Sequence, residues 1–213
     1  VTYTSNSTSS NETVGHGLGV KPDMLIAKNR DFGYNWDIYN SSLGYNASLT
    51  FTTAATRSGA FGTSEPTSSV FRTSPDFLTR GTDKYVVYCF ASKKGYSKFG
   101  TFTGNQNTNG TFIYTGFKPA WVMFKEATGS ATGDNWFIYD NKRSTFNQTQ
   151  KYLRANLSNA EQDNSAGAID MLSNGFKIRT ADASLNDSGE TYVFMAFAES
   201  PFVNSNGIPN NAR

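Results

Sequence analysis

Short runs in which apolar and polar positions alternate, separated by clusters of Gly, Ser, Thr and Asn, dominate the chain. A period of two places successive side chains on opposite faces of a strand. Residues 85–91 are apolar in both alternating sets, which predicts a central strand covered on both faces. Trp36 and Ile38 alternate with Asp37 and Tyr39, which predicts a strand whose Trp and Ile face a core while the other face can be wet.

Four blocks of the chain recur in the same order about 100 residues further on, which indicates an internal duplication. The blocks pair residues 2–4 with 101–103, 20–28 with 117–125, 35–40 with 135–140, and 85–91 with 192–198. We therefore predict one β-sandwich repeat over 1–98, a second over 99–202, and a polar C-terminal tail over 203–213. The expected fold is all-β, an antiparallel, jelly-roll-like sandwich, and the repeats could form one sandwich or two.

Residues 151–161 have a mixed pattern. Leu153, Leu157 and Ala160 recur at helical spacing, with a basic opposite face. The counterpart in the first repeat, near residues 48–55, alternates like a strand and is rich in β-branched residues. Because equivalent positions of a duplication adopt similar structures, we predict a strand over 152–155 and assign any short helix to the insert that follows.

Composition supports a β protein with many turns. Ser, Thr, Asn and Gly supply 87 of the 213 residues, whereas Leu supplies only 9, so a helical bundle is disfavoured. Aromatic residues make up 15% of the chain and replace the missing aliphatic bulk, which argues against disorder. No apolar stretch is long enough for a membrane helix, so we expect no membrane insertion.

Charge and reactive residues exclude several classes of protein. The net charge of +2 comes without a basic run, so we do not expect a nucleic-acid partner. Cys89 is the only cysteine and aligns with Ala196 of the second repeat, which indicates packing rather than catalysis. His16 is the only histidine and lies in a glycine-flanked turn, so a hydrolytic triad, a zinc site and a cofactor are not indicated. We predict that the protein is not an enzyme and holds no metal.

Exposed rings are the candidate binding residues. Tyr34, Tyr45 and Phe61 lie near predicted loops, where they could stack on sugars, although most rings in such a protein belong to the core. Trp36 and Trp136 are equivalent in the two repeats, and we expect both to be core residues. Paired carboxylates near the Trp motifs could support glycoside hydrolysis, but Asp37 is replaced by Phe137 in the second repeat, which disfavours that role.

Several motifs together resemble a duplicated β domain of tailed phages that is frequent in marine phages. They are residues 17–28, the motif from Trp36 to Tyr39, residues 85–100, residues 116–123, and the closing residues 207–213. The likeness spans nearly the whole chain. It implies a tail-fibre or other virion surface protein, and it brings no catalytic residues.

The resemblance and the composition lead to the same expectation. We expect a structural protein of the virion surface, made in the host cytoplasm, most simply a tail-fibre or receptor-binding module that attaches to a host surface glycan or protein. Its partners would be other virion proteins and further copies of itself, with a trimer expected by analogy with fibres. Two alternatives stay open, namely capsid decoration or a head fibre, and a carbohydrate-binding module or part of a polysaccharide depolymerase.

Overall fold

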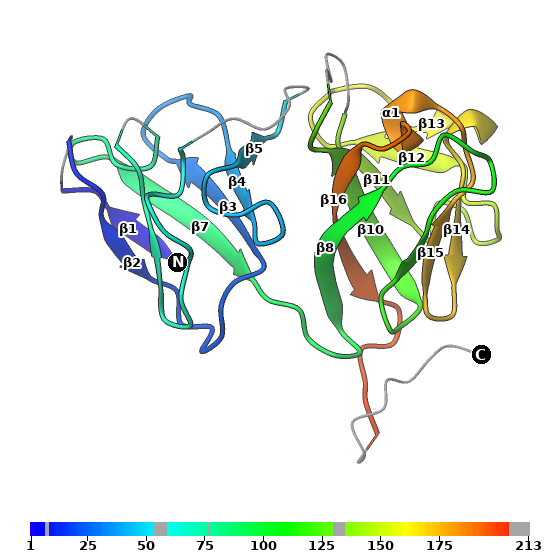
Figure 1. Ribbon diagram of the computed structural model, residues 1–213, viewed down its shortest axis with the longest axis horizontal. Helices are drawn as coiled ribbons and strands as arrows, with labels where there is room; N and C mark the ends of the chain where they lie inside the picture. Colours follow the sequence, from blue (N-terminus) through cyan, green and yellow to red (C-terminus); the bar gives the residue numbers. More distant parts are fainter. Residues whose placement is uncertain (7–8, 53–58, 76, 130–134, 205–213) are drawn as a thin grey trace. The chain divides into compact units, whose positions relative to one another are not determined.

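The computed structural model describes residues 1–6, 9–52, 59–75, 77–129 and 135–204. All pairings between its named strands are antiparallel, so the predicted all-β class is confirmed (Figure 1). The chain forms two compact units, with the main boundary between Ala91, the last residue of unit 1, and Ser92 of unit 2; Thr52 also belongs to unit 2. Each unit has a hydrophobic cluster of its own and is described separately.

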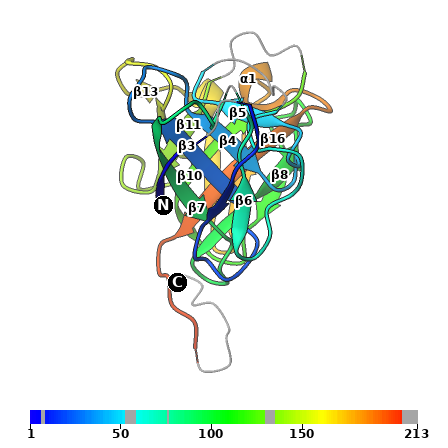
Figure 2. The ribbon, with the colours of Figure 1, turned by 90° about the vertical axis from the view of Figure 1, so that its left-hand side faces the viewer.

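Unit 1 contains a five-stranded sheet and a two-stranded sheet. The large sheet has the order β1-β7-β3-β4-β5 and can be followed in Figures 1 and 2. Its strands are β1 (Thr2–Thr4), β7 (Lys84–Phe90), β3 (Met24–Asn29), β4 (Asp37–Asn40) and β5 (Ser48–Thr50), and the small sheet pairs β2 (Thr13–Gly15) with β6 (Val70–Arg72). Both sheets contribute side chains to one buried cluster, for example Leu25 and Tyr39 from the large sheet and Phe71 from the small one. This two-layer arrangement is an antiparallel sandwich.

Unit 2 contains a six-stranded sheet and a three-stranded sheet. The large sheet has the order β13-β12-β11-β10-β16-β8, and the small one has the order β14-β15-β9. The strands are β8 (Ser97–Thr103), β9 (Phe112–Tyr114), β10 (Pro119–Glu126), β11 (Phe137–Asp140), β12 (Lys151–Arg154), β13 (Gln162–Asp163), β14 (Ile169–Leu172), β15 (Gly175–Ile178) and β16 (Thr191–Ala198). Two short helices are described, the 3-10 helix η1 (Ser165–Gly167) and α1 (Ala183–Asn186).

Aromatic rings join the two sheets of unit 2. Phe176 of the small sheet contacts the rings of Phe102, Phe124 and Phe194 on the large sheet, at centroid distances of 6.3, 6.3 and 5.6 Å. Rings at these distances stabilise a core by more than their buried area alone. The abundance of aromatic residues in the sequence is therefore used largely for packing.

The large sheets of the two units have matching strand orders and registers. In unit 1, Leu25 on β3 lies opposite Tyr39 on β4 and Cys89 on β7. At the aligned positions of unit 2, Val122 on β10 lies opposite Tyr139 on β11 and Ala196 on β16. The duplication stays a prediction, which these equivalent pairs support.

An aromatic pair at the edge of each large sheet repeats in the same way. Tyr3 on β1 stacks on Tyr85 of β7, with ring centroids 5.0 Å apart and planes inclined by 10°. Phe102 on β8 stacks on Tyr192 of β16, at 4.9 Å and 11°. Because β8 pairs with β16, unit 2 begins before the boundary predicted at residue 98.

The structure corrects the predicted facing of the Trp motif. All four residues of β4 are buried, so neither of its faces is wet. Tyr39 belongs to the core cluster of unit 1, as Tyr139 does in unit 2, whereas Ile38 is buried outside that cluster. Both alternating sets of the motif contain large apolar residues, so the period of two could not say which set faces the core. Trp136 is fully buried as expected, whereas Trp36 is only half-buried.

The central strand β7 is also less covered than its sequence predicts. Tyr85 and Val87 are buried in the core, but Tyr88 on the opposite face is 50% exposed. Its aromatic ring stacks on Trp36 at 6.2 Å. An apolar face of a strand can therefore be partly exposed to solvent when its aromatic side chains cover one another.

The first part of the mixed segment 151–161 is a strand, as the comparison of the repeats predicts. β12 covers Lys151–Arg154, and no described helix begins before η1. The predicted strand is therefore confirmed. It packs through Tyr152, whose buried ring lies 5.5 Å from that of Phe137 and 5.6 Å from that of Tyr139.

Of the predicted tail, residues 205–213 lie outside the described part of the chain.

Candidate functional site

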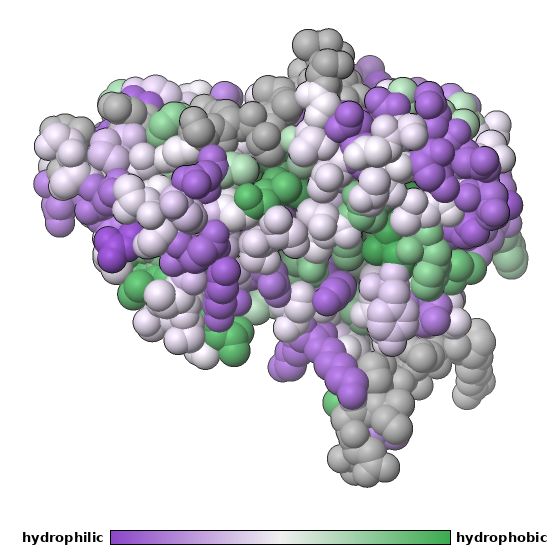
Figure 3. All heavy atoms as spheres, in the orientation of Figure 1, coloured by the Kyte–Doolittle hydropathy of each residue, from purple (hydrophilic) through white to green (hydrophobic). Residues whose placement is uncertain are grey.

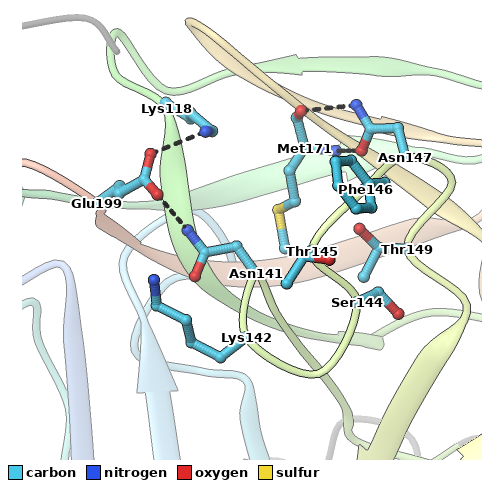
Figure 4. Close-up of a pocket in the computed structure, with 10 residues that line it drawn as sticks. All are labelled: Lys118, Asn141, Lys142, Ser144, Thr145, Phe146, Asn147, Thr149, Met171 and Glu199. Carbon is cyan, nitrogen blue, oxygen red and sulfur yellow. Dashed lines mark hydrogen bonds and ion pairs between the residues drawn. The ribbon is translucent and has the colours of Figure 1, made fainter. Parts of the chain in front are cut away.

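A pocket of about 380 Å³ lies in unit 2, where the loop after β11 meets β14 and the segment after β16. Its size is at the lower end of the range for small-molecule sites. The residues that line it are Lys118, Asn141, Lys142, Ser144, Thr145, Phe146, Asn147, Thr149, Met171 and Glu199 (Figure 4). Five of these ten residues have amide or hydroxyl side chains, and the others are two lysines, a glutamate, a methionine and one large aromatic residue, Phe146.

Hydrogen bonds within the loop fix its path. The carboxylate of Asp140 accepts a hydrogen bond from the amide of Arg143 at 2.8 Å and one from its Nε at 2.7 Å. Arg143 also donates to Glu161 at 2.6 Å, and this hydrogen bond is the main cause that raises the pKa of the guanidinium. The Ser144 hydroxyl accepts from the amide of Gln150 at 3.3 Å. The loop therefore starts and ends at fixed points.

Asn147 attaches the loop to the small sheet. Its Nδ2 donates to the carbonyl of Met171 at 2.9 Å, and its Oδ1 accepts from the amide of Met171 at 2.9 Å (Figure 4). A side-chain amide can satisfy a backbone donor and acceptor together in this way. The pair fixes the wall of the pocket that contains Met171.

The other end of the pocket is charged. Lys118 forms an ion pair with Glu199 at 2.8 Å, and Asn141 donates to the same carboxylate at 2.7 Å. Lys142 is exposed and forms no ion pair with any described residue. Figure 4 shows these groups on one side and Phe146 on the other, with the side chain of Met171 between them. Glu199 is the only acidic residue of the lining, so the lining does not supply a pair of carboxylates.

Phe146 is the most exposed large apolar residue described, with 84% of its surface accessible. The buried hydroxyl of Thr149, also in the lining, has no hydrogen-bond partner in the described chain. A ring that can stack and amides and hydroxyls that can donate and accept suit a ligand with both an apolar face and many polar groups. Sugars have this chemistry.

The three candidate binding rings predicted from the sequence differ in their exposure to solvent. Tyr34 is exposed on the loop between β3 and β4, Tyr45 is partly buried against the core of unit 1, and Phe61 is fully buried beside Tyr39 at 5.8 Å. Phe61 therefore has no surface for a ligand in this structure. A binding role for Tyr34 and Tyr45 stays a prediction.

Glu65 connects the residues around Tyr45. Its carboxylate accepts from the amide of Tyr45 at 2.9 Å and from the hydroxyl of Tyr39 at 2.6 Å, and it pairs with Lys21 at 2.9 Å. Burial opposes ionisation, but these donors outweigh it and lower the pKa of Glu65. The arrangement is a structural network on the surface of unit 1.

His16 and Cys89 have structural surroundings. Nδ1 of His16 accepts from the amide of Leu18 at 3.2 Å, and Nε2 lies 3.1 Å from the carbonyl of Thr67. Both ring nitrogens are thus used when Nε2 carries the proton. Cys89 packs against the core of unit 1, and burial raises the pKa of its thiol, which disfavours the reactive thiolate.

Sequence reasoning missed the aromatic residue of the pocket. Phe146 is the only large apolar side chain between Lys142 and Gln150, and a lone ring in such a polar run was an available signal. Six other lining residues lie in the same segment, within 141–149, but Lys118, Met171 and Glu199 come from distant parts of the chain, and no local pattern relates them to Phe146.

These features define a protein of antiparallel β-sandwich units with a polar, ligand-sized pocket in its second unit. Hydrophilic side chains cover much of the face drawn in Figure 3, with hydrophobic ones in smaller patches. The chain belongs to the family described as a domain of unknown function, DUF7483, which matches residues 1–201. No curated protein and no solved structure matches the chain significantly.

The part of the chain that the structure describes contains no group of three or more His, Cys, Asp or Glu side chains placed to hold a metal ion. None of its helices has the length and apolar character needed to cross a membrane.

Proposed function

We propose that the protein is a non-catalytic module of a phage particle surface, a tail-fibre or receptor-binding component that attaches to a glycan on the host cell. The observation that carries the proposal is the exposed ring of Phe146 beside a pocket lined by amides and hydroxyls. The resemblance of the chain to β domains of tailed phages supports the location on a virion.

Each part of the pocket has a role in this proposal. Phe146 stacks on the apolar face of a sugar ring, and Asn141, Ser144 and Thr145 exchange hydrogen bonds with its hydroxyl groups. The ion pair between Lys118 and Glu199 holds one wall in place. A single shallow site of this size binds weakly, so several copies on one particle act together and give a high overall avidity.

The fold suits this task. Its rigid antiparallel sheets present loops to water, and loops on a rigid scaffold commonly carry binding residues. The sequence has a single cysteine, so the fold forms without internal disulfides, as a protein made in a reducing host cytoplasm requires.

A glycan array and an adsorption assay on host cells test the binding role. Phe146→Ala is expected to weaken glycan binding roughly two- to tenfold, the equivalent of about 0.5–1.5 kcal/mol of aromatic stacking. Phe202→Ala is the matched control, because Phe202 is 68% exposed and does not line the pocket. Equal binding by wild type and the Phe146 variant would refute the role of the pocket.

Antibody labelling of intact particles in the electron microscope tests the location. Label at the tail or its fibres supports the receptor-binding proposal. Label over the capsid favours decoration instead, and the absence of the protein from purified particles refutes a virion role.

A further inference from the structure

A second group of exposed rings lies in unit 1, next to an arginine. Phe32 and Tyr34, on the loop between β3 and β4, are 55% and 43% exposed, with their ring centroids 5.8 Å apart. The guanidinium carbon of Arg80 lies 4.2 Å from the centroid of Tyr34. We refer to Phe32, Tyr34 and Arg80 as the arginine platform.

The guanidinium of Arg80 forms no ion pair or hydrogen bond with any described residue, and its buried Nε has no partner. Nε is the only nitrogen of this guanidinium that is buried without a hydrogen-bond partner. Stacking on Tyr34 restricts the side chain, and the planar fork of N–H groups can grip a carboxylate through two parallel hydrogen bonds.

The loop that presents the rings is fixed before any ligand binds. Oδ1 of Asn29 accepts from the amides of Asp31 and Phe32, both at 2.9 Å. The amine of Lys28 donates to the carbonyl of Phe32 at 3.2 Å and also to that of Tyr34. Ordering a loop on binding costs affinity, so a loop that is already ordered favours a small ligand.

Nearby carboxylates have other partners. Asp31 accepts from the amide of Lys84 at 2.7 Å, and Asp83 accepts from Nδ2 of Asn29 at 2.7 Å. Neither forms an ion pair with Arg80. Arg30, on the same loop, is exposed and adds positive charge. The platform is therefore an aromatic surface with a fixed cation that an acidic ligand can reach.

We infer that the arginine platform binds a sugar that carries a carboxylate, with the carboxylate on Arg80 and the apolar face of the sugar on Phe32. This inference rests on the proposed glycan-binding function and names a second subsite and its ligand class. It is separate from the Phe146 pocket, which belongs to unit 2.

Two sugars that differ in one group test the inference. The isotope-labelled full chain is titrated with methyl β-D-glucuronide and with methyl β-D-glucoside, and binding is followed by NMR. The glucuronide is expected to bind about tenfold or more tightly, because two charge-assisted hydrogen bonds depend on its carboxylate. Shifts are expected at residues 28–36 and 80–84, and the preference is expected to weaken with added salt.

Variants identify the cation. Arg80→Gln is expected to abolish the preference for the glucuronide, and Arg80→Lys to retain part of it, since lysine keeps the charge but not the fork. Arg72→Gln, on β6, removes the same charge from unit 1 at an exposed position and is expected to keep the full preference. The Lys variant provides the test if the Gln variant does not fold.

Specific outcomes overturn the inference. Equal affinity for the two sugars does so, as does a preference that both Arg80 variants keep in full. A 6-sulfated glucoside that binds more tightly than the glucuronide overturns the assignment of a carboxylate. Binding that depends on Phe146 but not on Arg80 leaves the proposed function in place and refutes the platform alone, whereas binding that depends on Arg80 alone refutes the pocket.

Discussion

The equivalent tyrosines Tyr39 and Tyr139 provide a direct test of how burial sets the strength of a hydrogen bond. The hydroxyl of Tyr139 donates to the carbonyl of Gly167 at 2.6 Å, and both groups are buried. The hydroxyl of Tyr39 donates to Glu65 at the same distance, but the side chain of Glu65 is 40% exposed. Burial also raises the pKa of both hydroxyls, so both remain donors at neutral pH.

Replacement of each tyrosine by phenylalanine keeps the ring and removes only the donor. In Tyr139→Phe the carbonyl of Gly167 is left buried without this partner, and such a loss costs about 1–3 kcal/mol of folding free energy. In Tyr39→Phe the acceptor that loses its donor is a charged carboxylate, but water can reach it and Lys21 and the amide of Tyr45 still bind it, so we expect a smaller cost of about 1 kcal/mol. The difference should appear as a separation of a few degrees in Tm, since about 1 kcal/mol shifts the Tm of a 60–100-residue domain by roughly 4–8 °C and that of a larger domain by less.

Urea and thermal unfolding of the full chain measure both variants. Each unit has its own core, so each variant is expected to shift the unfolding of its own unit. Far-UV circular dichroism confirms that both variants keep the β fold. If Tyr39→Phe costs as much as Tyr139→Phe, the argument from burial is wrong.

Three other predictions concern the fold. The pKa of Glu65 is lower in the folded protein than its ordinary value, so the stabilisation from its ionised form is complete at neutral pH and is lost as the pH falls through the folded pKa. In Glu65→Gln the free energy of unfolding should therefore fall less steeply at acid pH, as measured by urea unfolding at several pH values. Gly104→Ala should destabilise unit 2 by about 1–3 kcal/mol or more, because an added Cβ would lie 2.1 Å from the carbonyl oxygen of Asp187, while Gly33→Ala, with open space around it, should be nearly neutral in the same unfolding assay. Phe61→Ala should lower the free energy of unfolding by about 3–5 kcal/mol, because it truncates a fully buried core residue. If this variant instead lost glycan binding and kept its stability, the assignment of Phe61 to the core would be wrong.

Much of the fold could be predicted from the sequence. Alternation of apolar and polar positions identified the main strands, and the repeated blocks related strands of unit 1 to strands of unit 2. Comparison of the repeats also predicted a strand over 152–155, against a helical spacing of Leu153 and Leu157, and the structure has this strand at Lys151–Arg154. These successes share a cause, because strand periodicity is a local property of the chain.

The sequence could not show in the same way which residues of a strand enter the core cluster or which aromatic rings are exposed. Ile38 and Tyr39 are both buried, and only the packing of the second layer placed Tyr39 in the core cluster of unit 1. Tyr34 and Phe61 looked equally suitable as surface rings, yet one is exposed and the other fully buried. Burial depends on neighbours that are distant in sequence.

The sequence by itself determined an antiparallel β protein with repeated blocks, rich in rings and poor in reactive groups. The tertiary structure decided which side chains meet. It brought Lys118, Phe146 and Met171 to one pocket, and it placed Arg80 over the ring of Tyr34. The physical reason is that strand formation follows from local alternation, whereas a binding surface forms only when the folded chain brings distant loops into contact.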